Sequence, residues 1–465
     1  MSYGMASLPK RLWQAAMRSR QGARDVVVST IPQLVGALTG FFGSVLVARG
    51  LGPAGMGQYA LVMSLAGVAT TLSDLGIGQT AIRYASRAAA LRDVPGQMTV
   101  LRWALRWRLG LVVLVTGTFC LLTPSIARLW HNEPLTPLLR LGLVGGVFAV
   151  LASIPTIYFQ SIKRFSTNAA IMSAQKLVSF SGIVVLAAMG LWSLRNLVIV
   201  GILASALAAL AFLIVVPKAS VWPESAAWTL RRLRMKSFFA GPALHTGTDA
   251  PGSSSPTGFL GFMVISTVVV MLTSQADVWM MGYFLKTSEV GAYCVAARFV
   301  LPLNIAIGAL NSALWPRVSG ATTNDELLRL LKNTMFWTAL TAGFSVVYAA
   351  CAPLLAVFLF GRVYAGSVLL GQLLCLRCCM SMFISPLGLV AYGFGIVRIA
   401  WMINLAQLVA VIGLNIVLLP RIGAMGSVLA LLANEIIGMI CLGLFLISRY
   451  RQITDARADG LRANV

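Results

Sequence analysis

The sequence predicts an all-α polytopic membrane protein with about twelve transmembrane helices, arranged as two six-helix lobes. Two properties of the composition lead to this prediction: a mean hydropathy of +0.85 and a hydrophobic content of 58%. A third observation is a polar segment near the midpoint that divides the apolar runs into two groups. A soluble chain of 465 residues could not bury so much apolar surface, so we expect a protein of the bilayer.

The individual helices are expected where apolar runs reach about 20 residues, the length that crosses a bilayer. Six such runs precede the polar midpoint and six follow it. We place them near residues 26–48, 57–82, 109–127, 138–160, 169–190 and 194–216, and then near 258–284, 290–314, 333–357, 365–391, 398–419 and 424–447.

The polar segments define the expected domain organisation. A basic N-terminal segment, 1–25, precedes an N-lobe over 26–216. A linker over 217–257 carries the basic stretch RRLRMK and the Gly/Ser/Pro-rich stretch GTDAPGSSSPTG, which is typical of a flexible connection. A C-lobe over 258–447 and a tail over 448–465 complete the chain.

The net charge of +23 indicates orientation rather than nucleic-acid binding in a chain this apolar. With the N-terminus inside, the segments expected in the cytoplasm hold 26 of the 36 Lys and Arg residues, whereas the opposite loops hold seven. This asymmetry predicts that both termini are cytoplasmic.

An internal repeat supports the division into two lobes. A shift of 234 residues places Gly57 and Tyr59 on Gly291 and Tyr293. The same shift places the segment YFQSIKR (158–164) on YGFGIVR (392–398). Because each lobe has six spans, both lobes enter the membrane from the same side. The pseudo-two-fold axis is therefore expected along the membrane normal, with a transport site between the repeats.

Two motifs suggest chemistry that the context does not favour. Gly50-Leu51-Gly52-Pro53-Ala54-Gly55 spells the dinucleotide fingerprint G-x-G-x-x-G, but the residues before it end a membrane-length run rather than a strand. We therefore expect a tight external turn over residues 49–57. Cys375 and Cys378 have redox or metal-pair spacing, yet they lie within a span. We interpret them as small buried hydrophobic residues and expect neither cofactor nor metal.

The same region carries a family resemblance. The segments ARGLGPAGMGQYAL (48–61) and LSDLGIGQTAIRY (72–84) resemble the opening of the bacterial polysaccharide flippases, which belong to the multidrug/oligosaccharidyl-lipid/polysaccharide exporter (MOP) superfamily. The resemblance implies alternating-access export of a polyprenyl-diphosphate-linked oligosaccharide across the bacterial inner membrane, for surface polysaccharide assembly. The bilayer and that lipid-linked substrate are the implied partners, with a polysaccharide polymerase and a chain-length regulator as further candidates.

Ionisable residues within spans are the candidate site residues, because each is costly there. Arg298 could bind the substrate diphosphate through its guanidinium group, or it could pair with Asp277. Lys176 and Arg377 are cationic candidates for the cavity lining, with pairing or packing as the alternatives. Asp74 could be a proton or Na⁺ site, although an ion pair or a cap at a helix break is favoured.

Asp277 is the second acidic candidate for a coupling proton or Na⁺, and for it too an ion pair or a cap at a helix break is favoured. Gln33 in the first span lies on a polar, glycine-containing face, which suits helix packing or a cavity lining. Glu435 in the last span is expected to make an interhelical hydrogen bond.

Three other functions remain open at this point. A multidrug or cation antiporter of the same superfamily would favour acidic cavity residues over cations. A membrane polysaccharide polymerase or ligase would need a long external loop, and no nucleophile–base set is apparent in this sequence. A non-transporting scaffold would tolerate neutral substitutions at Arg298 and Lys176.

Overall fold

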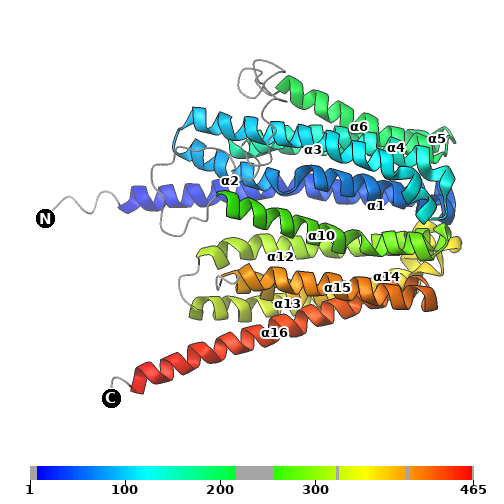
Figure 1. Cartoon of the computed structure of the whole chain (residues 1–465). Coiled ribbons are helices and arrows are strands. Elements are labelled where there is room, and N and C mark those ends of the chain that lie inside the picture. Colours follow the sequence, from blue (N-terminus) through cyan, green and yellow to red (C-terminus); the bar gives the residue numbers. More distant parts are fainter. Residues whose placement is uncertain (1–7, 163, 216–255, 321–323, 394–396, 463–465) are drawn as a thin grey trace.

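The computed structural model describes residues 8–162, 164–215, 256–320, 324–393 and 397–462, and all the regular structure in these ranges is helical (Figure 1). The N-terminal half contains α1 (Leu8–Asp74), α2 (Ile77–Ala90), α3 (Val94–Leu129), η1 (Glu133–Leu135), α4 (Thr136–Ser161), α5 (Phe165–Ala188) and α6 (Leu194–Val215). The C-terminal half contains α10 (Pro256–Phe284), α11 (Thr287–Ala296), η2 (Ala297–Val300), α12 (Leu301–Gly320), α13 (Asn324–Phe360), η3 (Arg362–Tyr364), α14 (Ser367–Gly393), α15 (Val397–Ile422) and α16 (Ala424–Arg462).

Figure 1 shows the two halves as two layers of long, roughly parallel helices, with both chain termini at the same end of the bundle. We call α1–α6 the N-lobe and α10–α16 the C-lobe. The end that carries the termini is called the terminal end. The opposite end, where α3 turns into α4 and α13 into α14, is called the distal end. The expected linker, 217–257, lies almost entirely outside the described residues.

Within the described residues, eleven helical stretches are long and apolar enough to cross a membrane. The first of them, Ile31–Ala90, is 60 residues long, whereas a single crossing takes about 20 residues. This stretch is interrupted at Gly52, where the backbone leaves the helical conformation. Counting its two arms separately gives the predicted twelve crossings in an all-α fold.

The turn between the first two crossings is tighter than the nine-residue turn expected over 49–57. Gly52 alone leaves the helix, with φ of 69° and ψ of −178°, and Pro53 begins the next arm. A positive φ is open to glycine at little cost, and proline is well suited to the first turn of a helix. The G-x-G-x-x-G match therefore joins two membrane helices and does not follow a strand.

Several helices extend beyond their apolar runs at the terminal end. The helix α3 has 36 residues and is therefore about 54 Å long, well over the bilayer core of about 30 Å. Its first turns pack against α2, which is separated from α1 by two residues with positive φ, Leu75 and Gly76. Hydropathy locates the membrane-spanning part of such helices but not their extensions.

The two lobes meet through a contact between equivalent positions of the internal repeat. A Cβ atom on Gly57 would lie 1.8 Å from the carbonyl oxygen of Thr287. A Cβ atom on Gly291 would lie 1.9 Å from the carbonyl oxygen of Pro53. The shift of 234 residues relates Gly57 to Gly291 and Pro53 to Thr287, so the contact is symmetric. The two backbones approach this closely because both positions are glycine.

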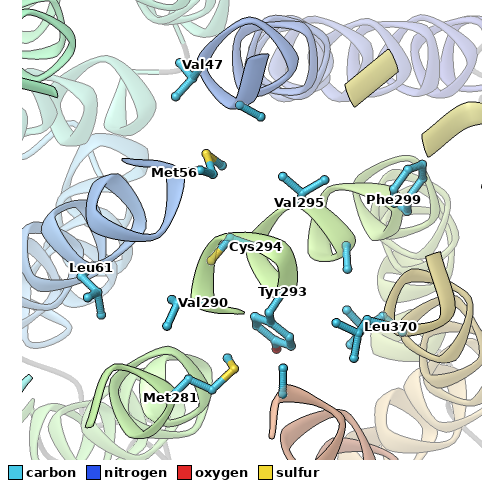
Figure 2. Close-up of a cluster of buried hydrophobic side chains, with 14 of the residues drawn as sticks. Val47, Met56, Leu61, Met281, Val290, Tyr293, Cys294, Val295, Phe299 and Leu370 are labelled. Carbon is cyan, nitrogen blue, oxygen red and sulfur yellow. The ribbon is translucent and has the colours of Figure 1, made fainter. Parts of the chain in front are cut away.

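Apolar side chains from both lobes surround this contact. Figure 2 shows Val47, Met56 and Leu61 of α1 in the same buried cluster as Val290 and its neighbours in α11. These α1 residues are 0–1% exposed, and the same cluster continues through Phe299 into α14. The buried core thus includes the interface between the lobes.

Candidate functional site

The N-lobe contains a cavity of about 290 Å³, bounded by α1, α4, α5 and α6. We call it the N-cavity. Its polar groups are one cation, one amide and several hydroxyls, and five glycines form part of its wall. The lining residues are Tyr59, Met63, Ala66, Gly67, Thr70, Gly142, Gly145, Gly146, Ala149, Gln175, Lys176, Ser179, Leu197, Val198, Gly201, Ile202, Ala204 and Ser205.

Lys176 supplies the single charge of the N-cavity. Its side-chain carbons lie about 3.7 Å from the position that a Cβ on Gly36 would occupy, so the aliphatic stem lies along α1. No acidic side chain of the described residues lies within ion-pair distance of its ammonium group. The neighbouring Gln175 is oriented by a hydrogen bond from its Nε2 to the Ser205 hydroxyl, at 3.3 Å. The N-cavity is therefore electropositive.

The C-lobe contains a second cavity, of about 310 Å³, which we call the C-cavity. It lies among α10, α14, α15 and α16 and is richer in amides and charges than the N-cavity. Its lining consists of Val270, Thr273, Ser274, Asp277, Arg377, Asn404, Gln407, Leu431 and Asn434.

The charges of the C-cavity have partners. Arg377 Nε lies 3.1 Å from Glu435 Oε1, and the two side chains are 35% and 9% exposed. The Tyr293 hydroxyl donates a hydrogen bond to Asp277 Oδ2. One guanidinium group thus faces two carboxylates, whereas in the N-cavity a single ammonium group faces none of the described acidic side chains.

Arg298 lies where the lobes meet rather than beside Asp277. It belongs to η2, the short 3-10 segment that interrupts the eighth crossing between α11 and α12. Its Nε atom is buried and lacks a hydrogen-bond partner, and no ion pair joins it to an acidic side chain of the described residues. The guanidinium group lies within electrostatic range of the hydroxyl of Tyr59, a residue of the N-cavity wall.

At the distal end, polar contacts join the lobes. Arg49 of α1 donates hydrogen bonds of 2.6 Å to the carbonyl oxygens of Phe358 and Leu359, at the C-terminal end of α13. The Tyr364 hydroxyl donates to the carbonyl oxygen of Ala48 at 3.0 Å. Burial raises the pKa of Tyr364 to about 12, so this hydroxyl keeps its proton. Arg49, the first residue of the external turn expected over 49–57, thus reaches across to the other lobe.

Besides Arg298, two of the predicted site residues lie outside both cavities. Asp74 ends the second arm of α1, where its Oδ1 lies 2.6 Å from Arg108 Nη2 and accepts a hydrogen bond from the Gly78 amide at 3.0 Å. This is the ion pair and helix-break cap that the sequence favoured. Gln33 is exposed on α1 and lines neither cavity.

The structure thus places Lys176 in the N-cavity, Asp277 and Arg377 in the C-cavity, and Arg298 at the junction of the lobes. Sequence reasoning missed the amides of both linings, and it gave no role to Tyr59. The repeat had paired Tyr59 with Tyr293, and that pairing was the available signal. The structure places Tyr293 at Asp277 of the C-cavity and Tyr59 at the N-cavity.

Comparisons with known proteins agree with this architecture. Two family models match, and both are described as "Polysaccharide biosynthesis protein"; the first covers residues 23–245 and the second covers 251–369. No curated protein matches the sequence.

Solved structures share the fold at low sequence identity. An inward-facing multidrug transporter of the MATE family, in the MOP superfamily, matches with a TM-score of 0.70 at 14% identity, over 92% of this chain and 99% of that chain. The lipid II flippase MurJ, in an inward closed conformation, matches with a TM-score of 0.67 at 15% identity, over 91% of this chain and 87% of its own.

A MOP-superfamily transporter from Pyrococcus furiosus, described as having a binding pocket of reversed polarity, matches with a TM-score of 0.57 at 14% identity. The match covers 92% of this chain and 95% of that chain. The likeness to these solved structures therefore extends over both lobes. The chain is a multi-pass membrane protein that matches models of polysaccharide biosynthesis proteins over residues 23–245 and 251–369, and it has the two-lobe fold of the MOP-superfamily transporters.

Proposed function

We propose that this protein is a flippase that moves a polyprenyl-diphosphate-linked oligosaccharide across the bacterial inner membrane by alternating access. The observation that carries the proposal is Arg298, whose guanidinium group lies at the junction of the lobes with a buried Nε atom that has no hydrogen-bond partner. Guanidinium binds phosphate oxygens through paired donors. A bound diphosphate would give that group the counter-charge that the described acidic side chains do not provide.

The orientation of the cycle belongs to the same proposal. The excess of Lys and Arg assigns the terminal end to the cytoplasm, so the distal end would face the periplasm. The contacts of Arg49, Tyr364 and the Gly57–Gly291 pair join the lobes at the distal side. A head group would therefore enter from the cytoplasm, and export would require these contacts to separate while the prenyl chain stays in lipid.

A coupling ion would act at the C-cavity. Asp277 and Glu435 place two carboxylates near one guanidinium group, which suits a proton or Na⁺ better than an anion. The same observation favours the rival function, a multidrug or cation antiporter. The rival function would be supported if expression of the protein conferred drug resistance and deletion of its gene caused no polysaccharide defect.

The proposal is tested by binding of undecaprenyl diphosphate to the purified full chain in nanodiscs. Arg298→Gln should lower the affinity at least about tenfold, because a charge-assisted contact to phosphate is lost. Arg140→Gln is the matched control, since the Nε atom of Arg140 donates to the Thr123 hydroxyl within the N-lobe and Arg140 lines neither cavity. Equal affinity of wild type and Arg298→Gln would overturn the assignment.

In cells, deletion of the gene should cause lipid-linked oligosaccharide to accumulate on the cytoplasmic side of the inner membrane. Wild-type protein and Arg140→Gln should restore export, and Arg298→Gln should not. Normal surface polysaccharide in the deletion strain would contradict the proposed function.

A further inference from the structure

We propose that the N-cavity is a subsite for a negatively charged sugar residue, such as a hexuronate, of the transported oligosaccharide. This inference rests on the proposed function and adds a substrate class to it. The argument depends on three properties of the N-cavity: its polar groups, its glycine wall and its uncompensated charge.

The polar groups match the hydroxyls of a sugar. Gln175, held by Ser205, presents an amide, and Ser179 and Thr70 present hydroxyls. These groups both donate and accept hydrogen bonds, as sugar hydroxyls do. Tyr59 adds an aromatic face and a hydroxyl.

The glycines leave room for one ring. A Cβ on Gly67 or Gly201 would meet nothing within 4 Å, so these positions border open space. The volume of about 290 Å³ lies at the lower limit of ligand pockets, which begin at about 300 Å³. A single sugar ring is therefore a better fit than a drug-sized molecule.

The charge selects an acidic sugar over a neutral one. A neutral ring that filled the cavity would displace water from the Lys176 ammonium group and provide no counter-charge, which is costly. A carboxylate on the ring would provide that charge through a charge-assisted hydrogen bond. Because Tyr59 lines the N-cavity and also lies near Arg298, one molecule could place its diphosphate at Arg298 and its acidic sugar at Lys176.

Four synthetic probes test the inference with the full chain in nanodiscs: undecaprenyl diphosphate alone, the same lipid with a glucosyl disaccharide, and two versions of the same lipid with a disaccharide containing one glucuronate. The glucuronate is placed next to the diphosphate in one version and at the far end in another. We expect the wild type to bind at least one glucuronyl probe about tenfold more tightly than the glucosyl probe.

Lys176→Gln should abolish this preference because it should lower the affinity of the glucuronyl probe alone. Lys176→Arg should keep the preference. Gly201→Leu should lower the affinity of the disaccharide probes but not that of undecaprenyl diphosphate, because a side chain at this position enters the cavity. Gly117→Leu is its matched control, since Gly117 also has nothing within 4 Å and does not line the cavity.

Equal binding of glucosyl and glucuronyl probes by the wild type would overturn the inference. If Lys176→Gln lowered the affinity of all the probes equally, the inference would also be overturned, because Lys176 would then contact the diphosphate. Binding of undecaprenyl diphosphate that depends on Arg298 would leave the proposed function intact in either case. Failure of every probe to bind would refute the proposed function itself.

Discussion

The two lobes share a repeated plan but differ in how their cavities hold charge. The N-cavity has one ammonium group and none of the described acidic side chains within ion-pair distance of it. The C-cavity is lined by both Arg377 and Asp277, and Arg377 forms an ion pair with Glu435. The two lobes thus share a scaffold, while the side chains that line their cavities give one cavity an uncompensated charge and the other compensated charges.

This difference suggests a division of labour between the lobes. An uncompensated cation favours binding of an anionic ligand, whereas a compensated cluster favours stability and a response to protons or cations. Arg298 lies at the junction and, like Lys176, has no acidic partner among the described residues. The positive groups without acidic partners therefore extend from the N-cavity to the interface of the lobes.

The largest expected effect tests the compensated cluster. Arg377→Gln would leave Glu435, only 9% exposed, without its partner. Breaking a buried pair in this way should lower the free energy of unfolding by about 3–5 kcal/mol. Lys176→Gln, which removes a cation without an acidic partner, should change it by less than about 0.5 kcal/mol. Unfolding of the purified proteins in detergent measures both.

The double variant Arg377→Gln/Glu435→Gln is the control, and it should recover most of the lost stability because neither charge remains. Glu435→Gln alone should cost less than Arg377→Gln, since the 35% exposed Arg377 side chain can reach solvent. Equal destabilisation by Arg377→Gln and Lys176→Gln would refute the contrast between the two cavities.

The second prediction tests where the lobes are alike. Gly57→Ala and Gly291→Ala should each weaken contact between the lobes by about 1–3 kcal/mol, because the new methyl group meets a carbonyl oxygen of the opposite lobe. Spin labels at Glu133→Cys and Ile422→Cys, in a background without other cysteines, would report wider separation of the distal ends.

Gly413→Ala should leave that separation unchanged, since a Cβ there meets nothing within 4 Å. The two interface variants should also have effects of similar size. A clear difference between them would show that the two-fold relation of the sequence does not extend to the energetics of the contact.

The fold was largely readable from the sequence because hydropathy and the glycine-containing turn are local signals. The run lengths predicted the crossings, and Gly52 marked the first turn. The terminal extensions of α2 and α3 were missed, because helix outside the bilayer does not need an apolar composition. The contact of Arg49 with Phe358 and Leu359 joins positions about 310 residues apart, and no local pattern announces it.

The site was only partly readable for a related reason. Charges within spans stand out because they are costly, so Lys176, Asp277, Arg298 and Arg377 were found. Their partners depend on how helices pack: Arg377 and Glu435 are 58 residues apart. Neutral groups such as Gln175 do not stand out in a hydropathy profile, although they supply most of the hydrogen-bonding capacity of the N-cavity.

The third prediction concerns coupling through the C-cavity. Asp277→Asn keeps a group that Tyr293 can contact but removes the charge. In proteoliposomes, a proton or Na⁺ gradient should accelerate flipping of a fluorescent polyprenyl-diphosphate disaccharide about tenfold less in this variant than in the wild type. Lys176→Gln should leave the response to the gradient intact. A wild-type rate that does not change when both gradients are collapsed would exclude coupling altogether.

The smallest expected effect tests an asymmetric contact between the lobes. Tyr364→Phe removes one hydrogen bond to the Ala48 carbonyl and should destabilise the distal contact by about 1 kcal/mol. Tyr348→Phe is the matched control, because the Tyr348 hydroxyl makes no hydrogen bond within the described residues. The spin-label separation between Glu133→Cys and Ile422→Cys again provides the measurement.

The pH dependence gives this last prediction a second readout. Because burial raises the pKa of Tyr364 to about 12, above the ordinary value near 10, the neutral hydroxyl is favoured when the lobes are in contact. The stabilisation of the distal contact by this hydroxyl should be complete below about pH 10 and should disappear as the pH rises towards 12. A difference between wild type and Tyr364→Phe that did not change over this interval would show that the hydroxyl does not hold the lobes together.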